Sequence, residues 1–301
     1  MEIPAGGLFI GIDGGGSGCR ARLADETGRI LGHGEAEPAA VRLGIERALA
    51  SVEAAARAAA RDAGLAPDAL ARSHAVVGLA GIGRKSVLAE LEVHRTPFAS
   101  VVWLNDATIA CVGAHRGRDG GIVIAGTGSV GLALQDGREI RVGGYGFPIS
   151  DEGSGADLGL RAIRAGLRAH DGRMAATKLT RSVMARFGGD PFEAVAFADC
   201  ATATDYAKFA PLVMDHAEAG DPVACTIVAH AAEEIESLAT RLAARGVRRI
   251  ALLGGLGSRL TAWLSPDSQR LFVPAQGDAI DGALNLARRF AAGSRFPAAQ
   301  A

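Results

Sequence analysis

The sequence is poor in cysteine: it has four in 301 residues, and none of them forms a CxxC pair. No cluster of histidines lies beside them, which disfavours a zinc site or an iron–sulfur cluster. Scattered cysteines without a disulfide framework are typical of a reducing cytoplasm. We therefore expect a cytoplasmic protein. The four cysteines are Cys19, Cys111, Cys200 and Cys225.

Charge of one sign and long apolar runs are lacking too. The formal net charge is -1, so we expect no nucleic-acid partner and no charged membrane surface as a partner, although a small anionic ligand needs only local charge. We find no run of about 18 apolar residues and no secretory signal at the start, so we expect no membrane span. Aromatic residues make up 5% of the chain and hydrophobic residues 49%. The core must therefore consist mostly of Ala, Val, Leu and Ile.

Two common nucleotide-binding motifs are missing. The chain has no GxxxxGK[ST] loop, and no GxGxxG stretch that leads from a predicted strand into a helix. Instead it has two glycine-rich turns, GGGSG and GTGSVG, each placed between two predicted strands. We call them the first glycine knot (Gly14–Gly18) and the second glycine knot (Gly126–Gly131).

The pattern of apolar residues predicts an α/β fold that repeats one plan twice. Each glycine knot sits in a group of three short strands, and helices with a further strand follow each group. We expect an N-terminal lobe over residues 1–115 and a C-terminal lobe over residues 116–301, with a cleft between them where a ligand could bind. A closing helix over residues 278–290 could complete the first lobe. The expected strands are Leu8–Ile12, Arg20–Ala24, Arg29–His33, His74–Gly81, Val101–Leu104, Ile122–Ala125, Val130–Gln135, Glu139–Val142 and one within Arg248–Gly257.

Helices are expected in four further places. The spacing of Ile45, Leu49, Val52 and Ala56 predicts an amphipathic helix that ends near Gly64. Others are expected over residues 107–115 and 156–169, and a long one begins at Asp221-Pro222, where Asp can cap and Pro can take the first helical position. Its inward stripe is predicted to be Val223, Ile227, Ala231, Leu238 and Leu242.

The glycine knots could bind phosphate. A turn with few β-carbons lets the backbone approach a bulky anion, and its N–H groups can donate to one phosphate. Two such knots on two lobes could hold one polyphosphate from both sides. The alternative is that both are plain tight hairpins, since glycine turns are common in them.

Two aspartates follow apolar strands. Asp13 ends the first strand, where a charge is costly unless a cation or hydrogen-bond donor lies near it. A Mg²⁺ ion bound to phosphates, through water, would serve; the alternative is an Asp that stabilises the turn. Asp106, in the segment VVWLND, could be a general base aimed into the cleft. The alternative is a helix N-cap formed by Asn105 or Asp106.

Two further glycine-rich segments could bind ligands. In Gly143–Gly159, Tyr145 could contact the apolar face of a sugar and Asp151 its hydroxyls, while Asp151 and Glu152 could instead stabilise a helix start. In Leu252–Leu260, the glycines could admit a flat ring such as adenosine against the backbone. A plain strand-to-helix connection is the alternative there.

The order of these segments resembles that of the N-acetylglucosamine kinase and BadF/BadG/BcrA/BcrD ATPase family, within the sugar kinase, Hsp70 and actin superfamily. The resemblance covers about Phe9 to Arg289. DGGGSGCRA resembles the first phosphate motif, LNDA the catalytic segment and AGTGS the second phosphate motif. GGYG with SDEGSG resembles the sugar loop, and LLGGLG the adenosine motif. The resemblance implies a ribonuclease H-like (actin-like ATPase) fold with two lobes and an interlobe cleft.

The resemblance also implies roles for the nucleotide site. It makes ATP and Mg²⁺ the expected cofactors, with Asp13 linked to the metal. Ser17 stands where the family has a threonine that touches phosphate. The other implied nucleotide-binding residues are Gly14, Gly15, Gly16, Thr127, Gly128, Gly220, Gly254 and Gly255.

For the sugar, the resemblance implies Asp106 as the base for a 6-hydroxyl group. The other implied sugar contacts are Thr127, Gly144, Tyr145 and Asp151. The chain departs from the family at two of the sugar positions: Ala40 replaces an asparagine, and Tyr145 replaces a tryptophan. These departures leave N-acetylglucosamine, glucosamine and other hexoses open as substrates.

The expected activity is therefore ATP-dependent phosphorylation of a small amino sugar, N-acetylglucosamine before glucosamine. An activator-type ATPase that drives a partner enzyme is the alternative, although the chain lacks a cysteine pattern suited to that class's iron–sulfur cluster. It also lacks the CxCGxxGCxE zinc cluster of the ROK sugar kinases. A non-catalytic sugar sensor would need neither Asp13 nor Asp106. A homodimer is the habit of the family.

Overall fold

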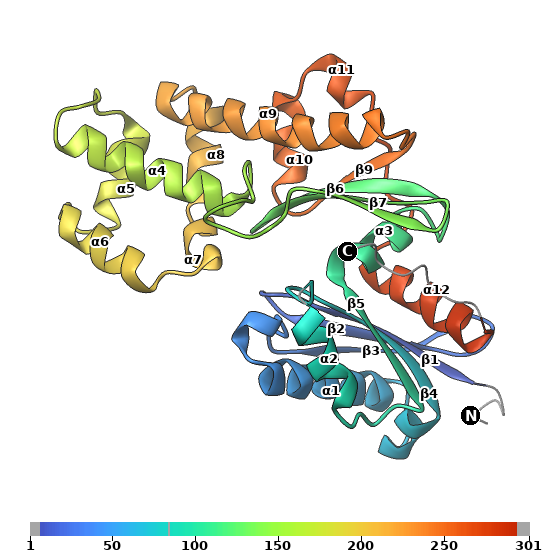
Figure 1. Ribbon diagram of the computed structural model, residues 1–301. Coiled ribbons are helices and arrows are strands. Elements are labelled where there is room, and N and C mark those ends of the chain that lie inside the picture. Colours follow the sequence, from blue (N-terminus) through green and yellow to red (C-terminus); the bar gives the residue numbers. More distant parts are fainter. Residues whose placement is uncertain (1–6, 84, 294–301) are drawn as a thin grey trace. The chain divides into compact units, whose positions relative to one another are not determined.

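The computed structural model describes residues 7–83 and 85–293, which form two compact units (Figure 1). The first unit comprises the described residues of Met1–Gly120, Ala133–Glu139 and Pro274–Ala301. The second unit comprises Gly121–Leu132 and Ile140–Val273. Both units contain a sheet and helices, so the predicted α/β class is confirmed.

The sheet of the first unit has five strands in the order β3-β2-β1-β4-β5. Strands β1 (Leu8–Gly14), β2 (Cys19–Ala24) and β3 (Ile30–Ala36) form an antiparallel meander. Strands β4 (Ser73–Leu79) and β5 (Ser100–Asn105) extend it in parallel with β1. The last residues of the three parallel strands, Gly14, Leu79 and Asn105, are in register. Everything that follows these strands therefore begins at one edge of the sheet.

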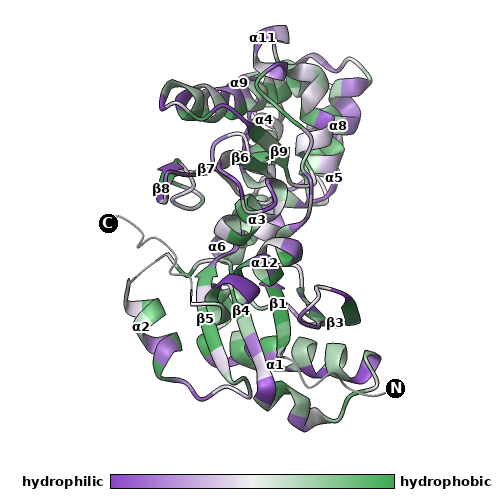
Figure 2. Ribbon diagram, turned by 90° about the vertical axis from the view of Figure 1, so that its right-hand side faces the viewer, coloured by the Kyte–Doolittle hydropathy of each residue, from purple (hydrophilic) through white to green (hydrophobic). Residues whose placement is uncertain are grey.

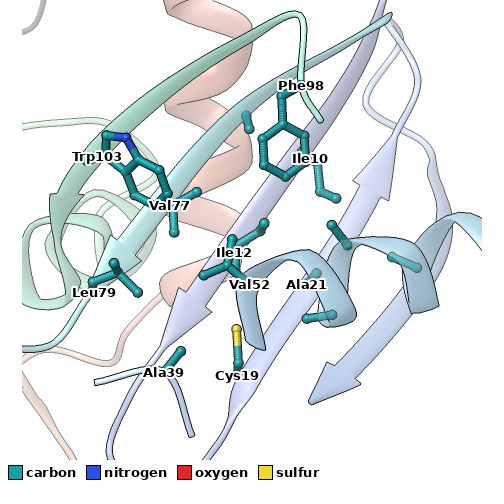
Figure 3. Close-up of a cluster of buried hydrophobic side chains, with 14 of the residues drawn as sticks. Ile10, Ile12, Cys19, Ala21, Ala39, Val52, Val77, Leu79, Phe98 and Trp103 are labelled. Carbon is teal, nitrogen blue, oxygen red and sulfur yellow. The ribbon is translucent and has the colours of Figure 1, made fainter. Parts of the chain in front are cut away.

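Helices cover both faces of this sheet. Strand residues alternate between the faces, so Ile10 and Ile12 pack with α1 (Ile45–Asp62), while Phe9 packs with α3 (Asp106–Ala114) and α12 (Ala279–Ala291). Figure 3 shows the first of these clusters, where Val52 of α1 lies over the side chains of β1, β2 and β4. Strands β1, β4 and β5 are mostly coloured as hydrophobic in Figure 2, as expected for strands covered on both sides.

Two glycines allow α3 and α12 to cross at backbone contact. A Cβ atom on Gly113 would lie 1.8 Å from the carbonyl oxygen of Asp278, and one on Gly282 would lie 1.9 Å from that of Ile109. Such distances leave no room for any side chain. Helix α12 thus fixes the position of α3, although about 170 residues of sequence separate the two helices.

The second unit is built on a four-stranded sheet in the order β8-β7-β6-β9. Strand β6 (Gly120–Ala125) runs parallel to β9 (Ile250–Leu253), and β7 (Ser129–Gln135) and β8 (Arg138–Val142) follow β6. The turn between β7 and β8, Ala133–Glu139, groups with the first unit. The chain therefore passes between the units more than once.

Helices make up most of the rest of the second unit. The longest is α9 (Pro222–Ala244), and Asp221 caps it by accepting from the backbone N–H groups of Val223 and Ala224, as predicted. The remaining helices are α4 (Gly155–His170), α5 (Lys178–Ala185), α6 (Pro191–Cys200), α7 (Ala203–Ala207), α8 (Ala210–Glu218), α10 (Gly257–Leu260), η3 (Thr261–Trp263) and α11 (Pro266–Gln269). The first unit also contains α2 (Lys85–Val93), η1 (Val41–Leu43) and η2 (Pro67–Arg72). None of the helices within the described residues has the length and apolar character needed to cross a bilayer.

All nine expected strands are present, and the helices expected near residues 45–64, 107–115, 156–169, 221 onward and 278–290 are confirmed with ends that differ by a few residues. The predicted inward stripe of α9 is wrong at two positions. Val223 and Leu238 are only half-buried, and the buried face includes Ala224, Val228 and Ile235 instead. The buried face is thus rotated from the predicted one, and half of its residues are alanines, which give a weak apolar signal.

Candidate functional site

The first glycine knot connects β1 to β2 at the shared edge of the first sheet. The N–H of Gly15 donates to the carbonyl of Gly18 across 2.9 Å, which closes the turn. A Cβ atom on Gly14 would lie 2.6 Å from the side chain of Leu79, whereas one on Gly15 would meet nothing closer than 3.9 Å. Within the described residues, the backbone N–H groups of Gly16 and Ser17 donate to no protein group. The knot thus offers two free donors, and Ser17 is exposed.

Asp13 lies one residue before this knot and pairs with a cation. Its carboxylate accepts a hydrogen bond of 2.7 Å from the guanidinium group of Arg20, the residue opposite it on β2. The side chain of Asp13 is 18% exposed and that of Arg20 is 53% exposed. The hydrogen bond to Asp13 raises the pKa of Arg20. The charge of Asp13 is therefore balanced by Arg20, and its carboxylate is partly accessible to solvent.

Asp106 begins α3 at the same edge. Asn105 is the N-cap: its side-chain oxygen accepts from the N–H of Ala107 at 2.9 Å, and a carboxylate oxygen of Asp106 lies at the same distance from that N–H. Asn105 thus occupies the N-cap position, and Asp106 accepts from the same N–H group. A Cβ atom on Gly78 would lie 3.3 Å from the Cα of Asp106, and Gly78 also pairs with Asp13 on β1. Asp13 and Asp106 therefore flank the same glycine of β4.

The segment that carries Ala40 lies against the first knot. The N–H of Ala39 donates to the carbonyl of Gly15 across 3.0 Å, and Ala40 is 1% exposed. This segment, where the sequence departs from the family, is therefore part of the same edge.

The second glycine knot connects β6 to β7 and lies beside the loop that carries Asp151. The N–H of Gly126 donates to the carbonyl of Gly128, and the N–H of Gly155 donates to the carbonyl of Gly126. A Cβ atom on Gly128 would lie 2.5 Å from a carboxylate oxygen of Asp151. In the described part of the chain, the N–H groups of Thr127 and Gly128 are free of protein partners. The structure thus brings together Thr127, Gly128 and Asp151.

The turn after β9 packs against Ala125, the residue just before the second glycine knot. Gly254 has a φ of +94°, and a Cβ atom on it would lie 2.3 Å from the carbonyl oxygen of Ala125. That carbonyl accepts from the N–H of Leu256. Gly255 has open space around it. The adenosine-like turn therefore packs directly on the strand that enters the second knot.

Gly220 is linked to this turn less directly. It has a φ of +81° just after α8, with no atom within 4 Å of the place where a Cβ would be. Arg259, on the helix that follows the Gly254 turn, pairs with Asp215 and Glu218 of α8 at 2.8 Å. These ion pairs connect the C-terminal end of α8, which precedes Gly220, to α10.

The loop between β8 and α4, residues 143–154, carries Tyr145 and Asp151; we call it the Tyr145 loop. Tyr145 is 73% exposed, whereas Asp151 is half-buried and accepts from the N–H of Gly146 at 3.1 Å. Burial raises the pKa of Asp151, and hydrogen bonds from Gly146 and Phe147 oppose that shift. The ring of Phe147 packs on Tyr206 with centres 5.0 Å apart. The loop is thus anchored on the helices and presents Tyr145 outward.

The residues fit a polyanion in each unit. Each knot has free backbone donors and no bulky side chains, which is the chemistry that phosphate recognition needs. For a metal, no group of three or more His, Cys, Asp or Glu side chains gathers anywhere in residues 7–83 and 85–293. A metal at Asp13 would accordingly take most of its ligands from phosphate and water, as Mg²⁺ commonly does.

Two residues of this region were missed in the sequence. Arg20 pairs with Asp13, and Arg141 contacts the Tyr145 loop through hydrogen bonds to Gly143 and Gly144. The sequence carried a signal for Arg20, because in a β-hairpin of this length the seventh residue after Asp13 can lie opposite Asp13 on the next strand. Arg141 carried no such signal, because its contacts depend on how the glycines after it turn.

The chain is similar to known sugar kinases. The chain is 42% identical over 279 residues to the glucosamine kinase GspK of Vibrio cholerae, with 93% of this chain and 95% of that protein covered. It is 38% identical over 112 residues to an N-acetylmuramic acid/N-acetylglucosamine kinase of Clostridium acetobutylicum, with 36% and 37% covered.

Two solved structures are similar as well. A protein of Chromobacterium violaceum, provisionally assigned as an N-acetylglucosamine kinase, has a TM-score of 0.89 at 37% identity, with 94% of this chain and all of that chain covered. A ROK family glucokinase of Streptomyces griseus has a TM-score of 0.60 at 20% identity, with 94% and 100% covered. This second likeness concerns the fold alone and confirms the predicted actin-like ATPase fold. Residues 10–287 match the BadF/BadG/BcrA/BcrD ATPase family, and the chain therefore belongs to that family.

Proposed function

We propose that the protein is an ATP-dependent kinase that transfers a phosphoryl group to the 6-hydroxyl of an amino sugar, with Asp106 as general base. The observation that carries the proposal is the position of Asp106. It begins α3 at the edge of the first sheet where the glycine knot and Asp13 also lie, and the N-cap role beside it is filled by Asn105. A carboxylate placed at the mouth of a phosphate-binding edge is suited to accept a proton from an attacking hydroxyl.

The relatives support the substrate class. The full-length relative is named a glucosamine kinase, and the shorter match is named for N-acetylmuramic acid and N-acetylglucosamine. We therefore propose an amino sugar as acceptor, and we place glucosamine beside N-acetylglucosamine as the first two sugars to test.

Phosphoryl transfer needs mainly positioning and neutralisation of charge. The free N–H groups of Gly16, Ser17, Thr127 and Gly128 would donate to phosphate oxygens. Asp106 would accept the proton of the sugar hydroxyl as its oxygen attacks the γ-phosphorus, and Asp151 would accept from another hydroxyl. A bound Mg²⁺ would neutralise phosphate charge, and Asp13 would hold the ion through water. The knots contribute no side-chain charge, so the metal would supply most of the positive charge that the phosphates need.

The proposal is tested by measuring ADP release with glucosamine, N-acetylglucosamine, glucose and no sugar. We expect ADP release that depends on an amino sugar, a product with phosphate on O6, and no turnover of a 6-deoxy amino sugar. ATP hydrolysis at the same rate with and without every sugar would instead support an activator-type ATPase.

The role of Asp106 is tested by Asp106→Asn, which keeps the size and the polar atoms of the side chain. We expect kcat to fall about 100-fold or more, in line with the loss of a general base, with KM for both substrates little changed. Asp68→Asn, an exposed carboxylate in the same unit, is the matched control and should keep full activity. A folded Asp106→Asn variant that works at the normal rate would remove Asp106 from the mechanism.

The proposal assigns nucleotide-binding residues to both knots. Hydrogen exchange with a non-hydrolysable ATP analogue should protect peptides that contain Gly14–Gly18 and peptides that contain Gly126–Gly131. Protection of only one knot at saturation would remove the other knot from the proposed nucleotide-binding residues.

A further inference from the structure

The Tyr145 loop has an unusual backbone. Gly143, Gly144 and Gly146 have φ values of +64°, +71° and +108°, and Asp151 has a φ of +68° although it carries a side chain. A non-glycine residue in that region costs free energy and persists only where its surroundings hold it. The glycines leave many other conformations open to the loop. Something outside the glycines must therefore select the observed conformation.

Arg141 is placed to do so. Its Nε donates to the carbonyl of Gly143 across 3.2 Å, and a terminal nitrogen of the same guanidinium donates to the carbonyl of Gly144. The planar fork of an arginine can serve two neighbouring acceptors at once, which an ammonium group cannot do in fixed geometry. Two successive carbonyls of the loop are thus fixed by one rigid group.

The same guanidinium contacts the aromatic ring that the loop presents. The central carbon of the guanidinium lies 5.7 Å from the centre of the Tyr145 ring, within the range of a cation–π contact. Tyr145 is otherwise highly exposed, and a side chain with so few contacts would sample several rotamers. The contact with Arg141 therefore restricts the ring as well as the backbone.

Arg141 has its backbone in a strand. It is the fourth residue of β8, and its carbonyl accepts from the guanidinium of Arg245 across 3.4 Å. Its positive charge also acts on Asp151, where it opposes the effect of burial on that carboxyl group. Tyr145 and Asp151 are the two loop residues expected to contact the sugar. Arg141 contacts the ring of Tyr145 and acts electrostatically on the carboxyl group of Asp151.

We propose that Arg141 is a positioning residue for substrate: it holds the carbonyls of Gly143 and Gly144 and the ring of Tyr145 in the arrangement that binds the amino sugar. The inference rests on the proposed function in taking the Tyr145 loop to be the sugar-binding loop. Arg141 acts through Tyr145 and the loop backbone and takes no part in proton or phosphoryl transfer.

The kinetic test compares Arg141→Ala with Arg141→Lys. In Arg141→Ala, KM for the amino sugar should rise about tenfold or more, because two charge-assisted hydrogen bonds that hold the loop are lost. KM for ATP and the thermal unfolding midpoint should stay near their normal values. Arg141→Lys keeps the charge but has its donors on a single nitrogen, so its KM should fall between those of the normal chain and Arg141→Ala. Arg138→Ala, an exposed arginine on the same strand, is the control and should leave every constant unchanged.

A double-mutant cycle with Tyr145→Ala separates positioning from a general loss of stability. If Arg141 acts through Tyr145, removal of Arg141 should raise KM for the sugar less in the Tyr145→Ala background than in the normal chain. Equal factors in both backgrounds would contradict the part of the inference that concerns Tyr145.

A third measurement does not depend on the enzyme activity. Hydrogen exchange of peptides covering residues 143–152 should become faster in Arg141→Ala and stay unchanged in Arg138→Ala. If the normal protein releases ADP without regard to sugar, the proposed function fails, and faster exchange still supports Arg141 as the residue that orders this loop. If exchange and KM for the sugar are both normal in Arg141→Ala, the inference is wrong.

Discussion

Asp151 combines a left-handed backbone with a half-buried carboxyl group that touches the second glycine knot. Burial is the largest effect on its pKa and raises it, while hydrogen bonds from Gly146 and Phe147 and the charge of Arg141 act in the other direction. A raised pKa means that Asp151 takes up its proton at a higher pH than an exposed aspartate does.

The pH dependence follows from that sign. As the pH falls from neutral, affinity for the amino sugar should decline while typical aspartates, with a pKa near 3.9, are still ionised. Asp151→Asn should bind the sugar more weakly at neutral pH and should lack this decline. The measurement is KM for the sugar between pH 8 and the lowest pH at which the protein stays folded. A decline that persists in the variant would assign it to another group.

Stability should depend on pH in the corresponding way. Because the folded-state pKa of Asp151 is raised, its favourable contribution is complete below the unfolded-state pKa and is lost as the pH rises through the folded-state pKa. The stability of Asp151→Asn relative to the normal chain should therefore increase from acidic to neutral pH. Urea unfolding at several pH values checks this, and the opposite trend would contradict the raised pKa.

The cysteines provide a separate test of burial. Cys19 and Cys111 are buried, and burial raises the pKa of each thiol to about 12, with a further rise at Cys19 from the charge of Asp13. Because the thiolate is the reactive form, iodoacetamide at pH 8 should modify exposed Cys200 in the folded protein and spare these two. Peptide mapping by mass spectrometry before and after unfolding measures it. Modification of Cys19 or Cys111 at the rate of Cys200 in folded protein would contradict the described core.

At the scale of elements, the crossing of α3 and α12 controls where Asp106 lies. In a helix, alanine is more favourable than glycine by about 1 kcal/mol. At Gly282, however, a Cβ atom would lie 1.9 Å from the backbone oxygen of Ile109, and backbone cannot move aside as a flexible side chain can. The steric effect should therefore outweigh the helix preference.

We expect Gly282→Ala to destabilise the first unit by about 2 kcal/mol or more, the range of overpacked core sites. Thermal and chemical unfolding measure this loss. Gly83→Ala is the matched control, because nothing lies within 4 Å of a Cβ atom there, and it should unfold as the normal chain does. Equal stability of the two variants would show that the helices can separate without cost.

Several elements could be predicted from the sequence because their patterns are local. The strands alternate or end in glycine, and Asp221-Pro222 marks the start of α9 by capping chemistry alone. Helix α2 was not predicted, because its nine residues have a weak apolar stripe. The bounds of the short helices between α4 and α9 were not predicted, since they depend on how Phe187, Phe197 and Phe209 cluster in space.

At the scale of the whole molecule, the sequence predicted that Asp13 and Asp106 lie near the ends of strands. It did not predict the packing that holds these strand ends in place. The order of strands and the position of each aspartate after a strand were readable, because the carboxyl ends of parallel strands meet at one edge. The pairing of Arg20 with Asp13 is local to one hairpin and could have been read from the sequence, whereas the approach of Asp151 to Gly128 depends on how a separate loop packs on the second knot. A boundary at residues 115 and 116 remains a prediction about functional lobes, and the compact units themselves join three segments and two segments.

Helix α12 has a consequence for biosynthesis. It contributes Ala283, Leu284, Leu286 and Ala287 to the cluster around Phe9 and Val76, yet it emerges from the ribosome after the entire second unit has been made. The first unit therefore keeps an apolar face uncovered until the second unit has been synthesised. Nascent chains should bind chaperones during that interval. Variants truncated before α12 should be degraded in the cell, because the cluster around Phe9 and Val76 stays exposed.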